Sequence, residues 1–89
     1  MTLNDSDIEE LRKDIDIIDR QLISNIIKRQ EIAKEIINFK VKNNIEIEDK
    51  DREAEILIHI NKFTSHKSYI SLAHEVYKLL FKNSKKLNE

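Results

Sequence analysis

Apolar residues recur at steps of three and four over the first 40 positions of the chain. The series is Ile8, Leu11, Ile15, Ile18, Leu22, Ile26, Ala33 and Ile36. This spacing is typical of one face of an α-helix. Ser6 and Glu9 have the spacing of a capping box at its start, and Asn43-Asn44 is the first interruption. The pattern predicts a single helix of about 36 to 38 residues, roughly 55 Å long at 1.5 Å per residue.

Two shorter helices are predicted after a polar connection at residues 43–49. The second begins near Asp49 or Lys50, and its apolar positions are Ile56, Leu57, Ile60 and Phe63. Residues 64–68 read as a loop with capping hydroxyls. The third helix runs from about Ser68 to Lys86, with a stripe of Tyr69, Ala73, Val76, Leu80 and Leu87. We therefore predict an all-α chain of three helices that forms a single domain over residues 1–89.

The first helix is too long for a compact monomer. A globule of this chain length has a radius of gyration of about 12 Å, so the helix and its apolar stripe extend beyond it. An exposed stripe of that size indicates a partner. We predict a twofold homodimer in which the two long helices pack along each other. The alternative is a helix that breaks near Asn25 and folds back as a four-helix bundle.

The composition excludes several classes of protein. The chain contains no Gly, Pro, Cys or Trp, and 37% of its residues are charged. The lack of Gly and Pro disfavours a hairpin-rich β fold, and the lack of Cys excludes disulfides, cysteine-ligated zinc and a thiol nucleophile. No apolar run approaches the roughly 18 to 20 residues of a membrane span, so we expect a cytoplasmic protein with no membrane partner. A net charge of −1 gives no overall nucleic-acid-binding character.

Two cations occupy the apolar stripe of the first helix. On a helical wheel with Leu22 at zero, Arg29 falls near −20° and Lys40 near 0°, while Arg12 lies at the edge, near 80°. The neighbouring stripe positions provide no acidic partner. A buried cation is costly unless it is paired.

Two interpretations of these cations remain. They could meet carboxylates from another helix, such as Glu53 or Asp49, or extend to the surface. Alternatively, they form a dry, preorganised pocket for an anionic ligand. Several cations on one stripe favour the pocket over the structural alternative.

Two further groups of polar residues accompany the stripe. Arg52 and Glu53 lie in the first turn of the second helix, where backbone N–H groups are unpaired, although a solvated, well-capped helix start would look the same. On the third helix, Ser84 continues the apolar stripe and Asn88 lies one turn further on. The alternative for this pair is fraying of a polar C-terminus.

Four segments together resemble the all-helical class of chorismate mutases. They are LRKDIDIID at 11–19, KRQEIA at 28–33, FK at 39–40 and DKDREAEIL at 49–57. Each segment alone is weak, but the ordered series covers nearly the whole chain. The resemblance implies an intertwined three-helix dimer with two active sites, each completed by the partner chain, in agreement with the overlong first helix.

The resemblance also implies how the substrate dianion is held. Arg29 would bind one carboxylate, and Arg12 from the other subunit would bind the second. Lys40 would donate to the ether oxygen. Asn88 falls where many members carry glutamine, the second donor to that oxygen, and its shorter side chain is the clearest departure from the family.

The remaining implied roles concern the ring of the substrate. Arg52 would add positive charge near a carboxylate, while Glu53 and the backbone at Asp49 would hold the ring hydroxyl. Ser84 matches a family serine near the ring carboxylate. Lys85 is a second departure, because an apolar residue is common at that position, and an outward orientation would accommodate it.

The implied reaction is the rearrangement of chorismate to prephenate, towards phenylalanine and tyrosine. It is unimolecular and needs no nucleophile, metal or cofactor, so His59, His66 and His74 are interpreted as surface or packing residues. One alternative is an isochorismate–pyruvate lyase of the same fold, but the arrangement of Asp49, Arg52 and Glu53 looks more like the mutase. The other alternative is a non-catalytic helical dimerisation module.

Overall fold

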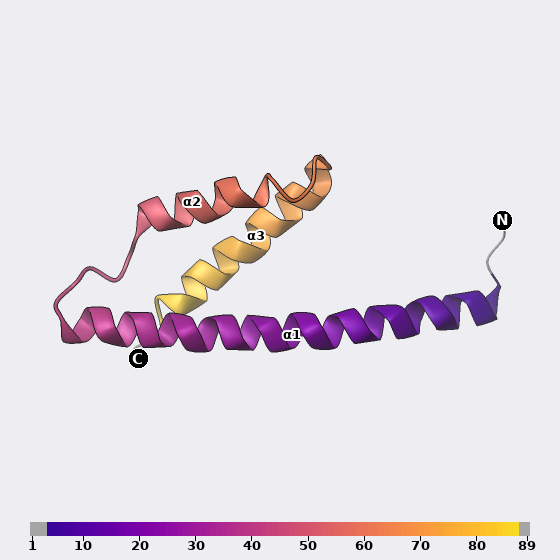
Figure 1. Ribbon diagram of the computed structural model, residues 1–89, viewed down its shortest axis with the longest axis horizontal. Helices are drawn as coiled ribbons and strands as arrows, with labels where there is room; N and C mark the ends of the chain where they lie inside the picture. The colour runs from indigo at the N-terminus through magenta and orange to yellow at the C-terminus, as the bar shows by residue number, and fades with distance from the viewer. Residues whose placement is uncertain (1–3, 88–89) are drawn as a thin grey trace. The chain divides into compact units, whose positions relative to one another are not determined.

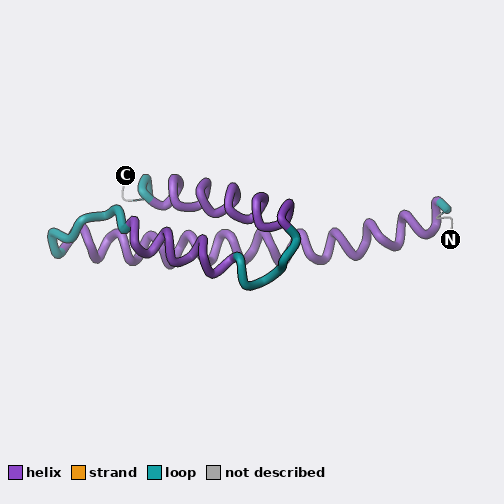
Figure 2. Tube along the Cα trace, turned by 90° about the horizontal axis from the view of Figure 1, so that it is seen from above, coloured by secondary structure: helices purple, strands orange, loops and turns teal. Residues whose placement is uncertain are grey.

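The computed structural model describes residues 4–87 and contains three α-helices in that range (Figure 1). They are α1 (Asp5–Lys42), α2 (Lys50–Ile60) and α3 (Lys67–Ser84). The rest of the described chain consists of turns and loops, with no strand (Figure 2). The prediction of an all-α chain with three helices and a long first helix is confirmed.

Helix α1 is continuous over 38 residues, so the predicted alternative of a break near Asn25 is wrong. Its cap also differs from the expected Ser6–Glu9 pair. The Asn4 side-chain oxygen accepts the Asp7 N–H at 3.0 Å, and the Asp7 carboxylate accepts the Asn4 N–H at 3.1 Å. This is the same reciprocal arrangement two residues earlier, because Asn4 is itself a strong N-cap residue with an acidic side chain three positions later.

The end of α1 is set by Asn44, which has a positive φ of 56°. The Ile45 N–H donates to the Lys40 carbonyl at 2.8 Å, and the Asn44 N–H donates to the Val41 carbonyl at 3.3 Å. These two bonds form a Schellman motif, which usually places glycine at the left-handed residue. The chain contains no glycine, and asparagine is the next most tolerant residue there. The interruption predicted at Asn43-Asn44 is therefore confirmed.

Helices α2 and α3 are slightly shorter than predicted. After Ile60 the chain continues in turns with bonds spaced three residues apart, and Phe63, expected on the second helix, lies beyond its end and is exposed. Helix α3 begins at Lys67 and ends at Ser84, so Leu87 lies outside it. The two helices contact each other, and the His74 Nε2 atom lies 3.0 Å from both the Leu57 carbonyl and the Asn61 side-chain oxygen.

The chain divides into two compact units, residues 1–31 and residues 32–89. The second unit contains the end of α1 together with α2 and α3, and each helix contributes one buried side chain to it: Ile37, Ile60 and Phe81.

The described part of the first unit, residues 4–31, contains α1 alone and buries no side chain. The apolar stripe there is exposed, with Leu11, Ile15, Ile18 and Leu22 each about half accessible. No helix among residues 4–87 is long and apolar enough to cross a membrane.

Candidate functional site

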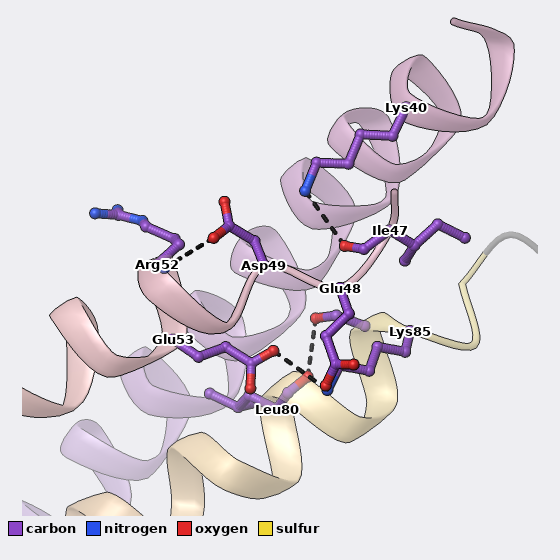
Figure 3. Close-up of polar contacts among 9 residues, drawn as sticks. Lys40, Ile47, Glu48, Asp49, Arg52, Glu53, Leu80 and Lys85 are labelled. Atoms are coloured by element: carbon purple, nitrogen blue, oxygen red, sulfur yellow. Dashed lines mark hydrogen bonds and ion pairs between the residues drawn. The ribbon is translucent and has the colours of Figure 1, made fainter. Parts of the chain in front are cut away.

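Four parts of the second unit bring several of the predicted polar residues close together (Figure 3). They are the last turn of α1, the 43–49 connection, the first turn of α2 and the end of α3. Lys40 comes from the first of these parts and Glu53 from the third. The contacts of each side chain decide which predicted residues this region assembles.

The Lys40 ammonium turns towards the connection that follows its own helix. Its Nζ donates to the Ile47 carbonyl at 3.3 Å, and the side chain is half-buried (Figure 3). Within the described chain it makes no ion pair, so neither Glu53 nor Asp49 neutralises it. Lys40 and Asp49 line the same open depression of about 510 Å³. The structure therefore places these two predicted residues together.

Asp49 is the N-cap of α2. Its carboxylate accepts the Arg52 N–H at 2.9 Å, and its carbonyl accepts the Glu53 N–H at 3.1 Å. A capped first turn stabilises the helix and fixes where the next side chains leave it. Asp49 thus determines the positions of Arg52 and Glu53 through the backbone.

Glu53 lies in an ion-pair cluster that also contains Lys85 and Glu48 (Figure 3). The Lys85 Nζ lies 2.8 Å from Glu48 Oε1 and 3.2 Å from Glu53 Oε2. The outward orientation considered for Lys85 is therefore wrong, because two carboxylates from other elements attract its ammonium. Glu53 is the least accessible member, with 26% of its side chain exposed.

The ionisation of the cluster reflects these contacts. The hydrogen bond from Lys85, and then its charge, hold the pKa of the Glu48 carboxyl below its ordinary value. The hydrogen bond to Glu48 raises the pKa of Lys85, burial opposes this, and Glu53 adds to the rise through its own hydrogen bond and charge. The shifts of Glu48 and Lys85 thus reflect their mutual ion pair, and the Lys85 ammonium also lies beside Glu53.

Arg52 does not join this cluster. Its guanidinium pairs with Glu55 on the next turn of α2 and is exposed, and Figure 3 shows it directed away from the Lys85 ammonium. It lines a separate open depression with His59 and Lys62. The structure places Arg52 in the first turn of α2, as predicted, with its guanidinium paired to Glu55.

The last two predicted positions lie at the C-terminal end. The Ser84 hydroxyl donates to the Leu80 carbonyl one turn earlier at 2.8 Å, and the residue is half-buried. Asn88 lies outside the described residues.

The two predicted arginines of the first unit have partners on α1. Arg12 is exposed and pairs with Glu9 at 3.0 Å, an ordinary pair one turn apart. Arg29 is half-buried, and its Nη1 donates to the Gln30 side-chain oxygen at 2.7 Å. Both side chains lie on the one continuous helix, as the sequence predicted.

Comparison with known proteins identifies the family. Residues 11–89 match the family described as chorismate mutase type II. This chain belongs to that family. It is also 29% identical over 83 residues to a chorismate mutase of Methanocaldococcus jannaschii, a match that covers 92% of this chain and 84% of the relative. No solved structure matches the chain.

Membership of the chorismate mutase type II family makes the chain an isomerase. The sequence did not predict two contacts near this site. These are the ion pair of Lys85 with Glu48 and that of Lys85 with Glu53. A charged residue at a usually apolar position was the one available signal for Lys85. Glu48 gave no signal, because its partner lies 37 residues away along the chain.

Proposed function

We propose that this enzyme rearranges chorismate to prephenate on the route to phenylalanine and tyrosine, by holding the dianion in a cationic pocket and stabilising charge on the ether oxygen. The observation that carries the proposal is Lys40. Its ammonium is half-buried, and its described partner is a neutral carbonyl rather than a carboxylate. A lysine has three N–H donors, so two remain for an anionic ligand.

The proposed rearrangement requires a positively charged group near the ether oxygen of the substrate. The rearrangement breaks the ether C–O bond and forms a new C–C bond within the same molecule, without a nucleophile or proton transfer. Negative charge grows on the ether oxygen as the C–O bond lengthens. A fixed ammonium in a dry pocket stabilises that charge more than it stabilises the ground state. Preorganised donors of this kind typically contribute roughly 3 to 4 kcal/mol each.

Two arginine clamps would hold the floppy dianion in the compact geometry that the reaction requires. Arg12 and Arg29 are 17 positions apart on α1, about 25 Å at 1.5 Å per residue, which is too far for both to grip one small molecule. We therefore propose a homodimer in which Arg29 comes from one chain and Arg12 from its partner. The exposed apolar stripe of α1 supports a partner helix along it.

The other proposed contacts surround the ring of the substrate. Glu53 accepts the ring hydroxyl beside the backbone at Asp49, and Ser84 lies near the ring carboxylate. Arg52 adds positive charge after exchanging Glu55 for the substrate.

Asn88 completes the proposed set as a second donor to the ether oxygen, although its position lies outside the described residues. Its side chain is one methylene shorter than glutamine but keeps the neutral amide donor.

A substrate assay of the purified chain tests the proposed function. We expect chorismate absorbance in the ultraviolet to decay as prephenate forms, with no pyruvate released from isochorismate. Arg29→Ala is expected to lose most of this activity, since it removes one of the two clamps. Pyruvate release from isochorismate without chorismate turnover would identify a lyase. A folded dimer that acts on neither compound would identify a dimerisation module.

A further inference from the structure

Lys85 connects three parts of the chain: the 43–49 connection, the start of α2 and the end of α3. Its ammonium lies between Glu48, which directly precedes the cap of α2, and Glu53 in the first turn of α2, while Lys85 itself directly follows α3 (Figure 3). One charge thus ties the end of α3 to the start of α2. Glu53 is the residue of this cluster to which the proposed mechanism gives a contact with substrate.

The contact between Lys85 and Glu53 is made to one carboxylate oxygen, Oε2. Lys85 lies 3.2 Å from Oε2, and the carboxylate has a second oxygen that can accept a hydroxyl from a ligand. A glutamate side chain that rotates freely must adopt one rotamer before its carboxylate can bind a hydroxyl in a fixed orientation. This ordering costs conformational entropy. An ammonium already bound to one oxygen reduces this cost, because the carboxylate is oriented before the substrate arrives.

The second carboxylate determines where the ammonium lies. Glu48 holds Lys85 at 2.8 Å, the shorter of the two distances, and Lys85 is 37% exposed at its side chain. A long lysine side chain with one acceptor would sample several rotamers. With two acceptors from neighbouring segments, its ammonium is restricted to the space between them.

We propose that Lys85 is a positioning residue that orients the Glu53 carboxylate for the ring hydroxyl of the substrate. This inference rests on the proposed function, and it gives a role to a residue at a position where the family commonly has an apolar side chain. A hydroxyl contact exists in both the bound substrate and the transition state. Its loss therefore raises KM more than it lowers kcat.

A double-mutant cycle between Lys85 and Glu53 tests the proposal. Lys85→Met keeps the length of the side chain and removes its charge. We expect KM for chorismate to rise about fivefold with kcat nearly unchanged, the scale of one partly exposed charge-assisted contact. Lys85→Arg restores most of the affinity. Glu53→Gln raises KM at least as much, and adding Lys85→Met to it causes no further rise, because Lys85 acts through the carboxylate.

The matched control is Lys86→Met, which removes the neighbouring exposed lysine and leaves KM unchanged. A fivefold effect of Lys85→Met that persists in the Glu53→Gln background would overturn the proposal, as would an unchanged KM. A fall in kcat alone, together with a lower melting temperature, would show a structural role. Wild-type protein that fails to convert chorismate would instead overturn the proposed function, and this inference with it.

Discussion

Lys40 differs from Arg12 and Lys13, two other cations of α1, in what surrounds its charged group. Arg12 pairs with Glu9 and Lys13 with Glu10, each one turn away on the exposed surface. Such pairs contribute little to stability because solvent screens them. Lys40 instead is half-buried and donates to the Ile47 carbonyl. A cation without a carboxylate partner among the described residues can pair with an anionic ligand.

We predict that Lys40→Ala loses catalysis far more than it loses folding. Turnover of chorismate should fall about 100-fold or more, the effect of removing one donor to a developing oxyanion. Thermal unfolding should change little, because the substitution removes one long hydrogen bond to the Ile47 carbonyl, which lies in a loop at the surface. The control Lys42→Ala removes an exposed lysine about half a turn further on, and we expect it to keep the turnover and the melting temperature of wild type. A variant at position 40 that melts well below wild type yet keeps most of its turnover would make Lys40 structural.

The cluster around Lys85 links a loop, the start of α2 and the end of α3. No single helix determines this pairing, because Glu48 precedes α2 in the chain and Lys85 follows α3. The pKa of Glu48 is lowered by Lys85, and that of Lys85 is raised chiefly by Glu48. Because both pKa values are shifted by the folded state, the linkage between these elements depends on pH.

The stability of the folded chain depends on pH in opposite senses through Glu48 and Lys85, because one pKa is lowered and the other is raised. The lowered pKa of Glu48 contributes stability above its ordinary value of about 4.3, which is lost as pH falls through the folded value. The raised pKa of Lys85 contributes stability below its ordinary value of about 10.4, which is lost as pH rises through the folded value. The full contribution is therefore present between these limits.

We predict that Glu48→Gln lowers the melting temperature at neutral pH by a small amount. The difference from wild type should shrink as pH falls below the ordinary carboxyl value of about 4.3, and it should disappear once pH lies below the lowered pKa of folded Glu48, where Glu48 is protonated in both folded and unfolded chains. Thermal unfolding followed by circular dichroism between pH 3 and pH 9 measures it. Glu46→Gln, in the same loop and exposed, provides the control and should show no such difference. An equal effect of Glu48→Gln at all pH values would contradict the ion-pair origin.

The whole molecule is expected to require two copies of the chain. Three side chains are buried among the described residues, whereas apolar residues along α1 remain about half exposed from Leu11 to Ile36. Burial of such a stripe is the main favourable term in association. In the proposed twofold dimer, the same stripe of a second chain would cover it.

We predict that two inactive variants complement each other in mixed dimers. Arg12→Ala and Arg29→Ala homodimers should both be nearly inactive if each site uses one arginine from each chain. Unfolding the variants together and refolding them gives half mixed dimers by random pairing, each with one intact site. Activity should recover to about a quarter of wild type, for independent sites in a closed dimer. Mixed dimers shown to be present but inactive would exclude a shared site.

Sequence alone was sufficient for the features that arise from local periodicity and local hydrogen bonding. The length of α1 followed from its apolar repeat, which is first interrupted at Asn43-Asn44. The start of α2 followed from Asp49, because a cap involves only the next three residues. The ordered motifs from Leu11 to Leu57 were sufficient to predict the family.

Tertiary structure decided which side chains meet across elements. Nothing in the spacing of residues 48, 53 and 85 indicates that they share a charge, because their contact depends on where two loops bring the helices. Lys40 likewise bonds to Ile47 because the connection folds back over the end of α1, and a helical wheel contains no information on the path of the chain after the helix ends.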